Sequence, residues 1–302
     1  MVTNNHPGAI NFQGVCVFSK SHYRKLTVAC GLIAWCVSSN TVCAQSVPST
    51  ATPLVDAAIS NAEVARLDKQ VYLSPPGLLT GSAHEPGQAT LPRLAASLTS
   101  MKWLGRDADD SLSLAVEQDH WVVKWKQHPP GSSTIVLSFD SWPQLMSEVT
   151  AVEASGDGSI YLPACMATTV GEKIRFEPQT FKNTVGYWVG KHDVAHWPLV
   201  VSRPGSYNVA VLQGCGKDQG GSRARIKLSD KFEGQSLEDQ SLAVQSLEFE
   251  VLETGHFQNF QWRHLGVLQV AQAGPHTLSI EPIEIKRDAL VDIRAIHLIP
   301  LP

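Results

Sequence analysis

Two stretches of the sequence place aromatic rings beside amide and imidazole groups. The first contains Tyr187 and Trp188, and the second runs from residue 254 to residue 262. An aromatic ring covers the apolar C–H face of a sugar, while amide, imidazole and carboxylate groups hydrogen-bond its hydroxyls. The two stretches therefore predict a sugar site whose side chains are Tyr187, Trp188, His256, Phe257, Gln258 and Asn259.

Burial in the core is the alternative for each of these aromatic residues. Large aromatic side chains are mostly buried in globular proteins. Phe260 and Trp262 are two residues apart, so on a strand they share one face. The sequence alone leaves the choice between core and ligand site open for any single ring.

Residues 213–222 are the most glycine-dense stretch of the chain. A phosphate-binding glycine loop opens a helix, and its Walker form ends in Lys followed by Ser or Thr. Here strands are expected on both sides, so the pattern favours a hairpin. The polar residues at its tip, Lys217, Asp218 and Gln219, could contribute to the rim of a ligand site.

Acidic residues in the second half of the chain offer a second kind of chemistry. Together with backbone carbonyls, carboxylates near strand ends hold structural calcium ions, and solvated surface acids are the alternative. The candidates for calcium are Glu153, Glu172, Glu177 and Asp292. A glycosidase needs two carboxylates that face one another across a cleft. The sequence does not show such a pair, so it assigns no catalytic residue and no cofactor besides calcium.

Two cysteines, Cys165 and Cys215, follow the part of the chain that resembles a targeting segment. In an exported protein they could form a disulfide, because such bonds persist outside the cytoplasm. Two buried thiols are the alternative. Neither residue lies in a recognisable nucleophile motif, so a catalytic cysteine is not predicted.

Residues 1–44 have the features of an export signal. The basic residues Arg24 and Lys25 precede an apolar run over 26–37, and a small-residue cleavage site ends at Ala44. The run is shorter than the roughly 20 residues of a membrane-spanning helix. We therefore expect cleavage near Ala44, export to the periplasm or the exterior, and no stable membrane insertion.

The charge of the chain argues against a nucleic-acid partner. It has 24 Lys and Arg residues against 28 Asp and Glu residues, a net charge of −4. Nucleic-acid binding relies on an excess of basic residues. A nucleic-acid partner therefore has no electrostatic support.

The polar and apolar patterning predicts an all-β protein of two antiparallel β-sandwich modules. Residues 45–90 are rich in Pro, Ser, Thr, Ala and Gly, and we expect a linker with a short helix at 56–70. Period-two alternation predicts a small antiparallel β module over 91–150. About eight strands separated by Pro and Gly turns predict a jelly-roll or galactose-binding-like sandwich over 151–302.

Short motifs relate both modules to glycosidase families. The segments 99–105, 112–114 and 133–138 resemble the small β-sandwich that follows the catalytic barrel in α-L-fucosidases of glycoside hydrolase family 29. The terminal module resembles modules appended to exported fucosidase-like and sulfatase-like proteins, and its layout is similar to family-six carbohydrate-binding modules. The motifs of this second resemblance are Phe176-Glu-Pro, Lys182-Asn-Thr-Val-Gly-Tyr-Trp188, Leu212-Gln-Gly-Cys-Gly216, Gln219-Gly-Gly-Ser222, Thr254-Gly-His-Phe-Gln-Asn-Phe260 and Asp292-Ile-Arg294.

The second resemblance implies a sugar cleft in the loops of the terminal module. Its first aromatic position corresponds to Tyr187 or Trp188, and its second to His256 and Phe257. The amide position in the final hairpin falls on Arg287 and Asp288, which departs from the family pattern. Asp288 joins the candidate ligand residues on this basis.

A family-29 enzyme carries its nucleophile and its acid/base residue on an α/β barrel of about 250 residues. Only 46 residues, Gln45 to Thr90, precede Leu91 after the expected cleavage site. We therefore expect a non-catalytic, exported protein that binds a polysaccharide or glycan. The alternatives are a truncated α-L-fucosidase-like hydrolase, and a docking module without a sugar ligand.

Overall fold

The computed structural model describes six segments of the chain: residues 46–54, 60–76, 86–107, 111–130, 132–229 and 245–302. The expected export signal at 1–44 lies outside these residues. Residues 43–302 belong to one compact unit. In the described segments, no helix is long and apolar enough to cross a membrane.

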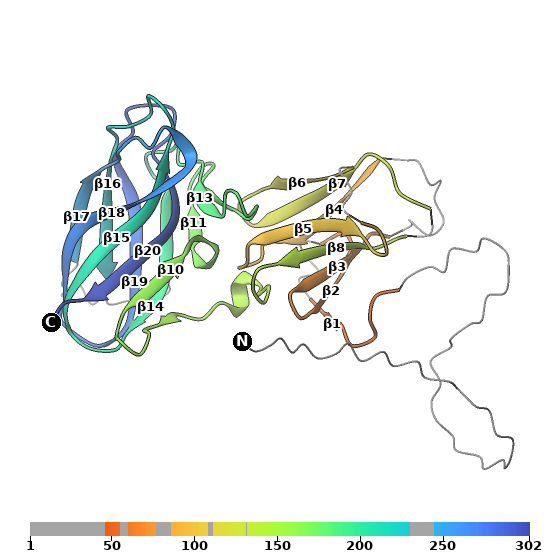
Figure 1. The fold of residues 1–302 in the computed structure, drawn as a ribbon, viewed down its shortest axis with the longest axis horizontal. Helices are drawn as coiled ribbons and strands as arrows, with labels where there is room; N and C mark the ends of the chain where they lie inside the picture. The colour runs from red at the N-terminus through yellow and green to blue at the C-terminus, as the bar shows by residue number, and fades with distance from the viewer. Residues whose placement is uncertain (1–45, 55–59, 77–85, 108–110, 131, 230–244) are drawn as a thin grey trace, which may run out of the picture. The chain divides into compact units, whose positions relative to one another are not determined.

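The first sandwich is built from a five-stranded and a three-stranded sheet (Figure 1). The strand orders are β1-β2-β3-β8-β5 and β4-β7-β6, and all neighbours are antiparallel. The bounds are β1 (Thr52–Pro53), β2 (Glu63–Leu67), β3 (Gln70–Ser74), β4 (Gly87–Pro92), β5 (Leu98–Trp103), β6 (Leu112–Val116), β7 (His120–Trp125) and β8 (Ile135–Phe139).

Aromatic pairs join the two sheets of the first sandwich. The ring of Trp103 on β5 lies edge-on to Trp125 on β7, with centroids 5.8 Å apart. Trp121 on β7 stacks with Phe139 on β8 at 6.3 Å. These rings are almost entirely buried, and such contacts add to the stabilisation that burial of their area provides.

The helix expected at 56–70 is corrected where the structure describes this segment. Residues 63–74 form the hairpin of β2 and β3, whose strands belong to the five-stranded sheet and not to a linker. The turn between them contains Asp68 with φ of 50°, a left-handed conformation that Asp tolerates better than most residues. Val71, Tyr72 and Leu73 in the middle of β3 are all buried.

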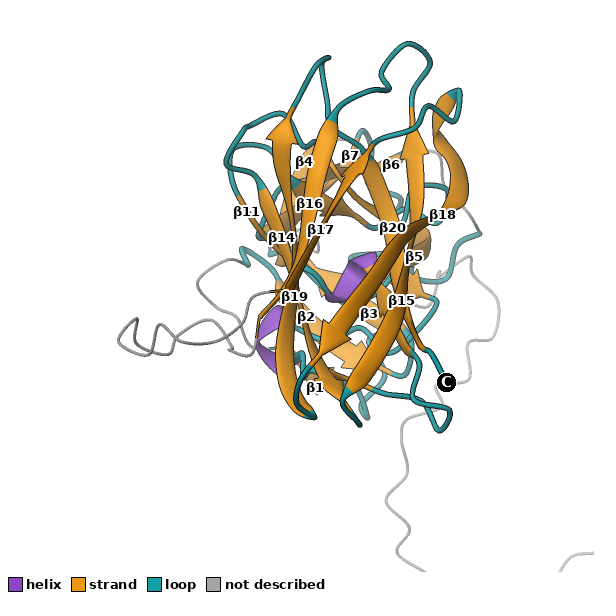
Figure 2. Ribbon diagram, turned by 90° about the vertical axis from the view of Figure 1, so that its left-hand side faces the viewer, coloured by secondary structure: helices purple, strands orange, loops and turns teal. Residues whose placement is uncertain are grey.

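The second sandwich packs two six-stranded sheets together. Apart from the parallel pair of β9 and β14, its strands pair antiparallel, as the predicted fold class requires. One sheet has the order β12-β13-β20-β15-β18 with β10 beside β20, and the other has β11-β14-β19-β16-β17 with β9 beside β14. Figure 2 shows how few helical turns interrupt these strands.

The bounds in this sandwich are β9 (Val152–Glu153), β10 (Ile160–Pro163), β11 (Thr168–Val170), β12 (Arg175–Glu177), β13 (Thr184–Gly186), β14 (Val194–Val201), β15 (Gly205–Cys215), β16 (Arg223–Ser229), β17 (Gln245–Glu250), β18 (His256–Val270), β19 (Gly274–Glu284) and β20 (Asp292–Pro300). Two short 3-10 helices, η1 (Met146–Glu148) and η2 (Ala164–Met166), lie before β9 and after β10.

Alternate residues of the long strands form the core of the second sandwich. Along β14, Ala195, Trp197, Leu199 and Val201 are buried and their neighbours are not fully buried. The indole Nε1 of Trp197 donates a hydrogen bond to the carbonyl of Pro163, so its one polar atom is satisfied. This alternation is the reason that strands could be predicted here from the sequence.

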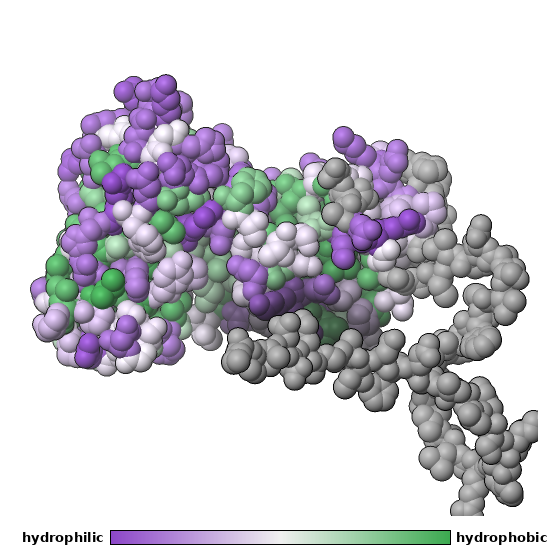
Figure 3. Space-filling model, viewed as in Figure 1, coloured by the Kyte–Doolittle hydropathy of each residue, from purple (hydrophilic) through white to green (hydrophobic). Residues whose placement is uncertain are grey.

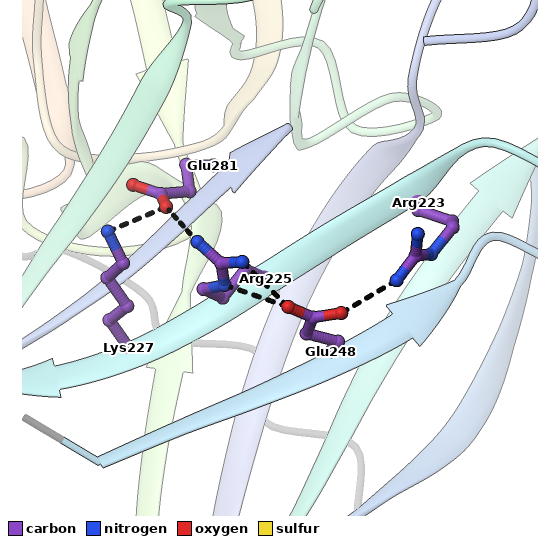
Figure 4. A network of polar contacts seen from close by, with 5 residues as sticks. All are labelled: Arg223, Arg225, Lys227, Glu248 and Glu281. Atoms are coloured by element: carbon purple, nitrogen blue, oxygen red, sulfur yellow. Dashed lines mark hydrogen bonds and ion pairs between the residues drawn. The ribbon is translucent and has the colours of Figure 1, made fainter. Parts of the chain in front are cut away.

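Charged side chains connect three strands on the outer face of the second sheet (Figure 4). Arg225 on β16 lies opposite Glu248 on β17 and Glu281 on β19, and bonds both. Arg223 and Lys227 extend the network to the same two glutamates. The network supports the pairing of strand β17, although exposed ion pairs contribute little each.

Backbone and ring contacts connect the first sandwich to the second. The N–H of Leu98 and the hydroxyl of Ser97 both donate to the carbonyl of Pro178. The rings of Trp121 and Phe176 lie 6.5 Å apart. Strand β12 of the second sandwich is therefore held at its end by the first.

Candidate functional site

Loops at one end of the second sandwich surround a hollow of about 310 Å³, which we call the Tyr187 hollow. This is the end at which β20 begins, and hydrophilic residues gather there on the face that Figure 3 shows. The hollow is lined by Glu177, Lys182, Tyr187, Val189, Phe257, Gln258, Ala289 and Asp292. The structure therefore brings three of the predicted ligand residues together: Tyr187, Phe257 and Gln258.

Tyr187 presents its ring to solvent at the hollow. It is 41% exposed and has φ of 59°, a left-handed conformation in which non-glycine residues are strained. The guanidinium of Arg175 lies 3.5 Å from the centre of its ring, and Lys182 Nζ lies 5.8 Å from it. Cation–π contacts of this kind fix the ring in one orientation.

Trp188, the neighbour of Tyr187, is a core residue. It is completely buried, and its Nε1 donates to the carbonyl of Val185 at 3.0 Å. The prediction of Trp188 as a sugar platform is therefore wrong, because its ring has no surface to offer a ligand. Its indole instead supports the backbone from which Tyr187 projects.

Asp193, which the sequence did not single out, holds the loop that carries Tyr187. Its side chain is fully buried and accepts hydrogen bonds from the backbone N–H groups of Val189, Gly190 and Glu172. An added Cβ at Gly190 or Gly171 would lie within 2.8 Å of this carboxylate, so only glycine fits beside it. The sequence contains one signal for this role of Asp193: an acid that follows Gly190 and precedes aromatic strand residues.

Phe257 and Gln258 form the opposite wall of the hollow at the start of β18. The backbone of β15 approaches Phe257 closely at Gly214 and Gly216, where an added Cβ would meet it at 1.9 Å and 2.7 Å. Thr254 accepts a hydrogen bond from the N–H of Cys215 and so ties the same loop to β15. The prediction of a hairpin over 213–222 is wrong, because β15 and β16 on either side of it belong to different sheets. The glycines of this connection instead bring the wall into position.

The other predicted ligand residues lie outside the hollow. His256 is exposed and its Nδ1 accepts from the N–H of Gln258, while Asn259 donates to the carbonyl of Thr254. Asp288 is exposed and pairs with Gln219 of the glycine-rich connection between β15 and β16. These contacts shape the loops, but they do not place the three side chains against the hollow.

A charged group forms the floor of the hollow, where two of the calcium candidates, Glu177 and Asp292, meet Lys182. Lys182 Nζ and Glu177 Oε1 form an ion pair at 2.5 Å, and Asp292 lies beside them. Glu177 and Asp292 are 4% and 7% exposed. An added Cβ at Gly186 would meet Asp292 Oδ1 at 2.7 Å and Glu177 Oε2 at 3.3 Å, so both carboxyl groups lie against this glycine.

The pKa of Asp292 is raised to about 8, first by burial and then by the negative charge of Glu177, while Lys182 and Arg294 act in the opposite direction. Asp292 is therefore largely protonated at neutral pH and can donate a hydrogen bond. Arg294 bonds the carbonyls of Phe181 and Lys182, which holds the loop before β13 over the floor.

The calcium site expected from Glu153, Glu172 and Asp292 is not formed. Glu153 and Glu172 are exposed, on β9 and in the loop before β12, whereas Asp292 is buried at the start of β20. Within the described segments, no group of three metal-ligating side chains lies together. Glu177, the fourth candidate, lies beside Asp292 at the floor of the hollow, but Glu153 and Glu172 do not join this pair.

Cys165 and Cys215 are free thiols in the structure, and Cys215 is fully buried. Burial raises the pKa of each thiol to about 11, so neither is a thiolate at neutral pH. Of the two alternatives that the sequence left open, the structure supports free thiols, of which Cys215 is fully buried and Cys165 partly buried.

Comparison with known proteins gives only distant structural likenesses. No family model and no curated protein matches the chain. An α-L-fucosidase from Vibrio sp. strain EJY3 is 14% identical, and the match covers 79% of this chain and 39% of the fucosidase with a TM-score of 0.31. A family 35 carbohydrate-binding module from Clostridium thermocellum is also 14% identical, and the match covers 47% of this chain and 98% of the module with a TM-score of 0.34.

An isomalto-dextranase of Arthrobacter globiformis T6 gives a similar result, at 15% identity and a TM-score of 0.35 over 79% of this chain and 36% of that chain. The chain thus spans well under half the length of the two enzymes it matches. At TM-scores this low, the likenesses assign neither a family nor an activity to it.

Proposed function

We propose that this chain binds a carbohydrate in the Tyr187 hollow and does not hydrolyse it. The observation that carries the proposal is the set of groups that the hollow presents. Tyr187 and Phe257 supply ring surface, Lys182 and protonated Asp292 supply donors, and Glu177 and Gln258 supply acceptors. Sugar hydroxyls both donate and accept, so this mixture matches them.

The test is retention of the purified chain on a panel of insoluble polysaccharides, followed by titration with the soluble glycan that releases it. Gln258→Ala should weaken binding, because it removes a hydrogen-bonding group from the wall. Tyr161→Ala is the matched control: Tyr161 is 47% exposed on β10 and does not line the hollow. Equal loss with both variants, or no retention on any glycan, would contradict the proposal and leave the docking module as the better account.

Hydrolysis is the second candidate, because Asp292 is an acid with a raised pKa beside the carboxylate of Glu177. Glycosidases use such a pair, with the protonated group as general acid. Against it, Glu177 is engaged by Lys182 at 2.5 Å and both carboxyl groups are buried. We expect no saturable turnover of an aryl α-L-fucoside. Turnover that disappears in Asp292→Asn would establish the hydrolase instead.

Export belongs to the same proposal. The basic, apolar and small-residue regions of 1–44 support it. Polysaccharides are met outside the cytoplasm, so a cleaved signal agrees with the proposed ligand. Mass determination of the protein secreted by its host would test cleavage after Ala44.

A further inference from the structure

A second and larger cavity, of about 460 Å³, lies away from the Tyr187 hollow. It is bordered by the end of β4, the turn before β7, η1 and β11. We call it the Arg93 cavity. Its lining residues are Pro92, Arg93, Gln118, Asp119, Leu145, Met146, Ser147, Thr168 and Thr169.

Arg93 is a buried cation without a counter-charge. The residue is 4% exposed, its Nη2 donates to the carbonyl of Cys165 at 3.2 Å, and its guanidinium lies 5.3 Å from the centre of the Phe176 ring. Its Nε has no hydrogen-bond partner, and no carboxylate in the described segments pairs with it. Burial lowers the pKa of Arg93 only to about 10, so the group stays charged at neutral pH.

An unpaired buried charge is costly, because it loses its hydration and gains no partner in return. One carbonyl and one ring replace only part of that hydration. Backbone N–H of Arg93 bonds the carbonyl of Asp119, which fixes the residue at the cavity wall. The guanidinium therefore has donor capacity that nothing in the described chain uses.

Thr169 adds a second unused group to the same cavity. Its Oγ1 is buried and has no hydrogen-bond partner, and its carbonyl accepts from Gln118, which holds β11 beside the β6–β7 turn. Asp119 is the one acid among the residues lining the cavity, and its Oδ1 is bonded to Nδ1 of His120 at 2.6 Å. Among the described residues, the buried atoms Arg93 Nε and Thr169 Oγ1 beside the cavity thus have no partner, while the carboxylate of Asp119 is already engaged.

We propose that the Arg93 cavity binds an oxyanion, the carboxylate or sulfate group of a small ligand or of an acidic sugar. Guanidinium groups bind such oxyanions through charge-assisted hydrogen bonds. Arg93 would supply the charge, and the Thr169 hydroxyl would supply a further donor. This site is separate from the Tyr187 hollow and does not depend on the function proposed there.

Calorimetric titration of the full chain with sodium sulfate, sodium glucuronate and D-glucose tests the proposal. Sulfate or glucuronate should bind saturably, and glucose should not bind at this site. Glucuronate without sulfate would indicate an acidic sugar, and sulfate without glucuronate a free anion. Absence of saturable heat with both anions would overturn the proposal.

Variants assign the binding to the cavity. Arg93→Met should weaken anion binding at least about tenfold, and Thr169→Val should weaken it less. Arg203→Met is the control, because Arg203 is exposed and does not line the cavity. Equal anion binding by Arg93→Met and the unmodified chain would overturn the assignment.

The stability of Arg93→Met gives an independent readout. Without an oxyanion, this variant should melt no lower than the unmodified chain, because replacing an uncompensated buried charge by an apolar side chain is often neutral or stabilising. If Arg93→Met does not fold, Arg93→Lys keeps the charge and should retain weakened binding. Tyr187→Ala should leave anion binding unchanged, so failure of one site does not imply failure of the other.

Discussion

The guanidinium of Arg175 lies 3.5 Å from the centre of the Tyr187 ring, while the backbone of Tyr187 is held at φ of 59°. A cation on the ring and a left-handed backbone together fix an exposed side chain. Such strain persists only where the surrounding structure compensates for it, and it is often found at ligand sites. Tyr187 is therefore the residue of the hollow whose substitution separates binding from folding most clearly.

We expect Tyr187→Ala and Tyr187→Gly both to abolish most glycan retention, because each removes the ring. The two variants should differ in stability. Glycine adopts a left-handed backbone without strain, so the free energy of unfolding of Tyr187→Gly should exceed that of Tyr187→Ala by about 1 kcal/mol. Urea denaturation of both variants measures this difference. Retention of glycan by either one would remove Tyr187 from the site.

Trp188→Ala should cost about 3–5 kcal/mol of the free energy of unfolding, the usual range for deletion of a large buried aromatic side chain. The indole is completely buried and its Nε1 bonds Val185. Urea denaturation followed by circular dichroism provides the measurement. A nearly unchanged free energy of unfolding, combined with lost glycan binding, would show that Trp188 is a ligand residue and not a core residue.

Stability should depend on pH through Asp292. Its pKa is about 8 in the folded chain, raised by burial first and by Glu177 second, against about 3.8 for an unperturbed aspartate. Between these two pKa values the folded state holds a proton that the unfolded state releases. The contribution of Asp292 to the free energy of unfolding is therefore largest below pH 4 and declines as the pH rises towards 8. Asp292→Asn, which cannot ionise, should lose this dependence. Denaturation of both proteins at acidic and alkaline pH compares them, and equal pH profiles would refute the raised pKa.

Residues 151–302 should fold without the first sandwich, because their two sheets have a core of their own. The isolated segment should melt cooperatively, but at a lower temperature than the full chain. It loses the bonds that Leu98 and Ser97 make to Pro178, and Phe176 loses its contact with Trp121. Calorimetry of the segment tests this, and a melt without cooperativity would place the boundary elsewhere.

The antiparallel sandwiches could be predicted because inward and outward residues alternate along strands such as β14. The hairpin of β2 and β3 was missed because the apolar residues of 56–70 also fit a helical spacing, and only pairing with β8 makes them a sheet. Tyr187 and Trp188 show the same limit in the site. Both rings are visible in the sequence, but a local backbone angle decides which one faces solvent.

The charged floor of the hollow could not be predicted from the sequence, for a related reason. Glu177 and Lys182 are close in the chain, but Asp292 is far from both and joins them only through the pairing of β12, β13 and β20. Asp193 was missed because its partners are backbone N–H groups, which carry no signal of residue type. The sequence predicted the walls of the hollow, which local motifs form. It did not predict the contacts that depend on strand pairing in the sheet.

The close fit of Gly214 and Gly216 against Phe257 has a consequence for how such proteins can diverge. A side chain at either position would collide with Phe257, whereas Tyr187 and Gln258 face open space and can be exchanged. At the proposed glycan site, ligand preference can therefore change between related proteins while the glycine pair stays fixed. In distantly related proteins, the two glycines would indicate a shared scaffold. The residues at 187 and 258 would vary with the ligand that each protein binds.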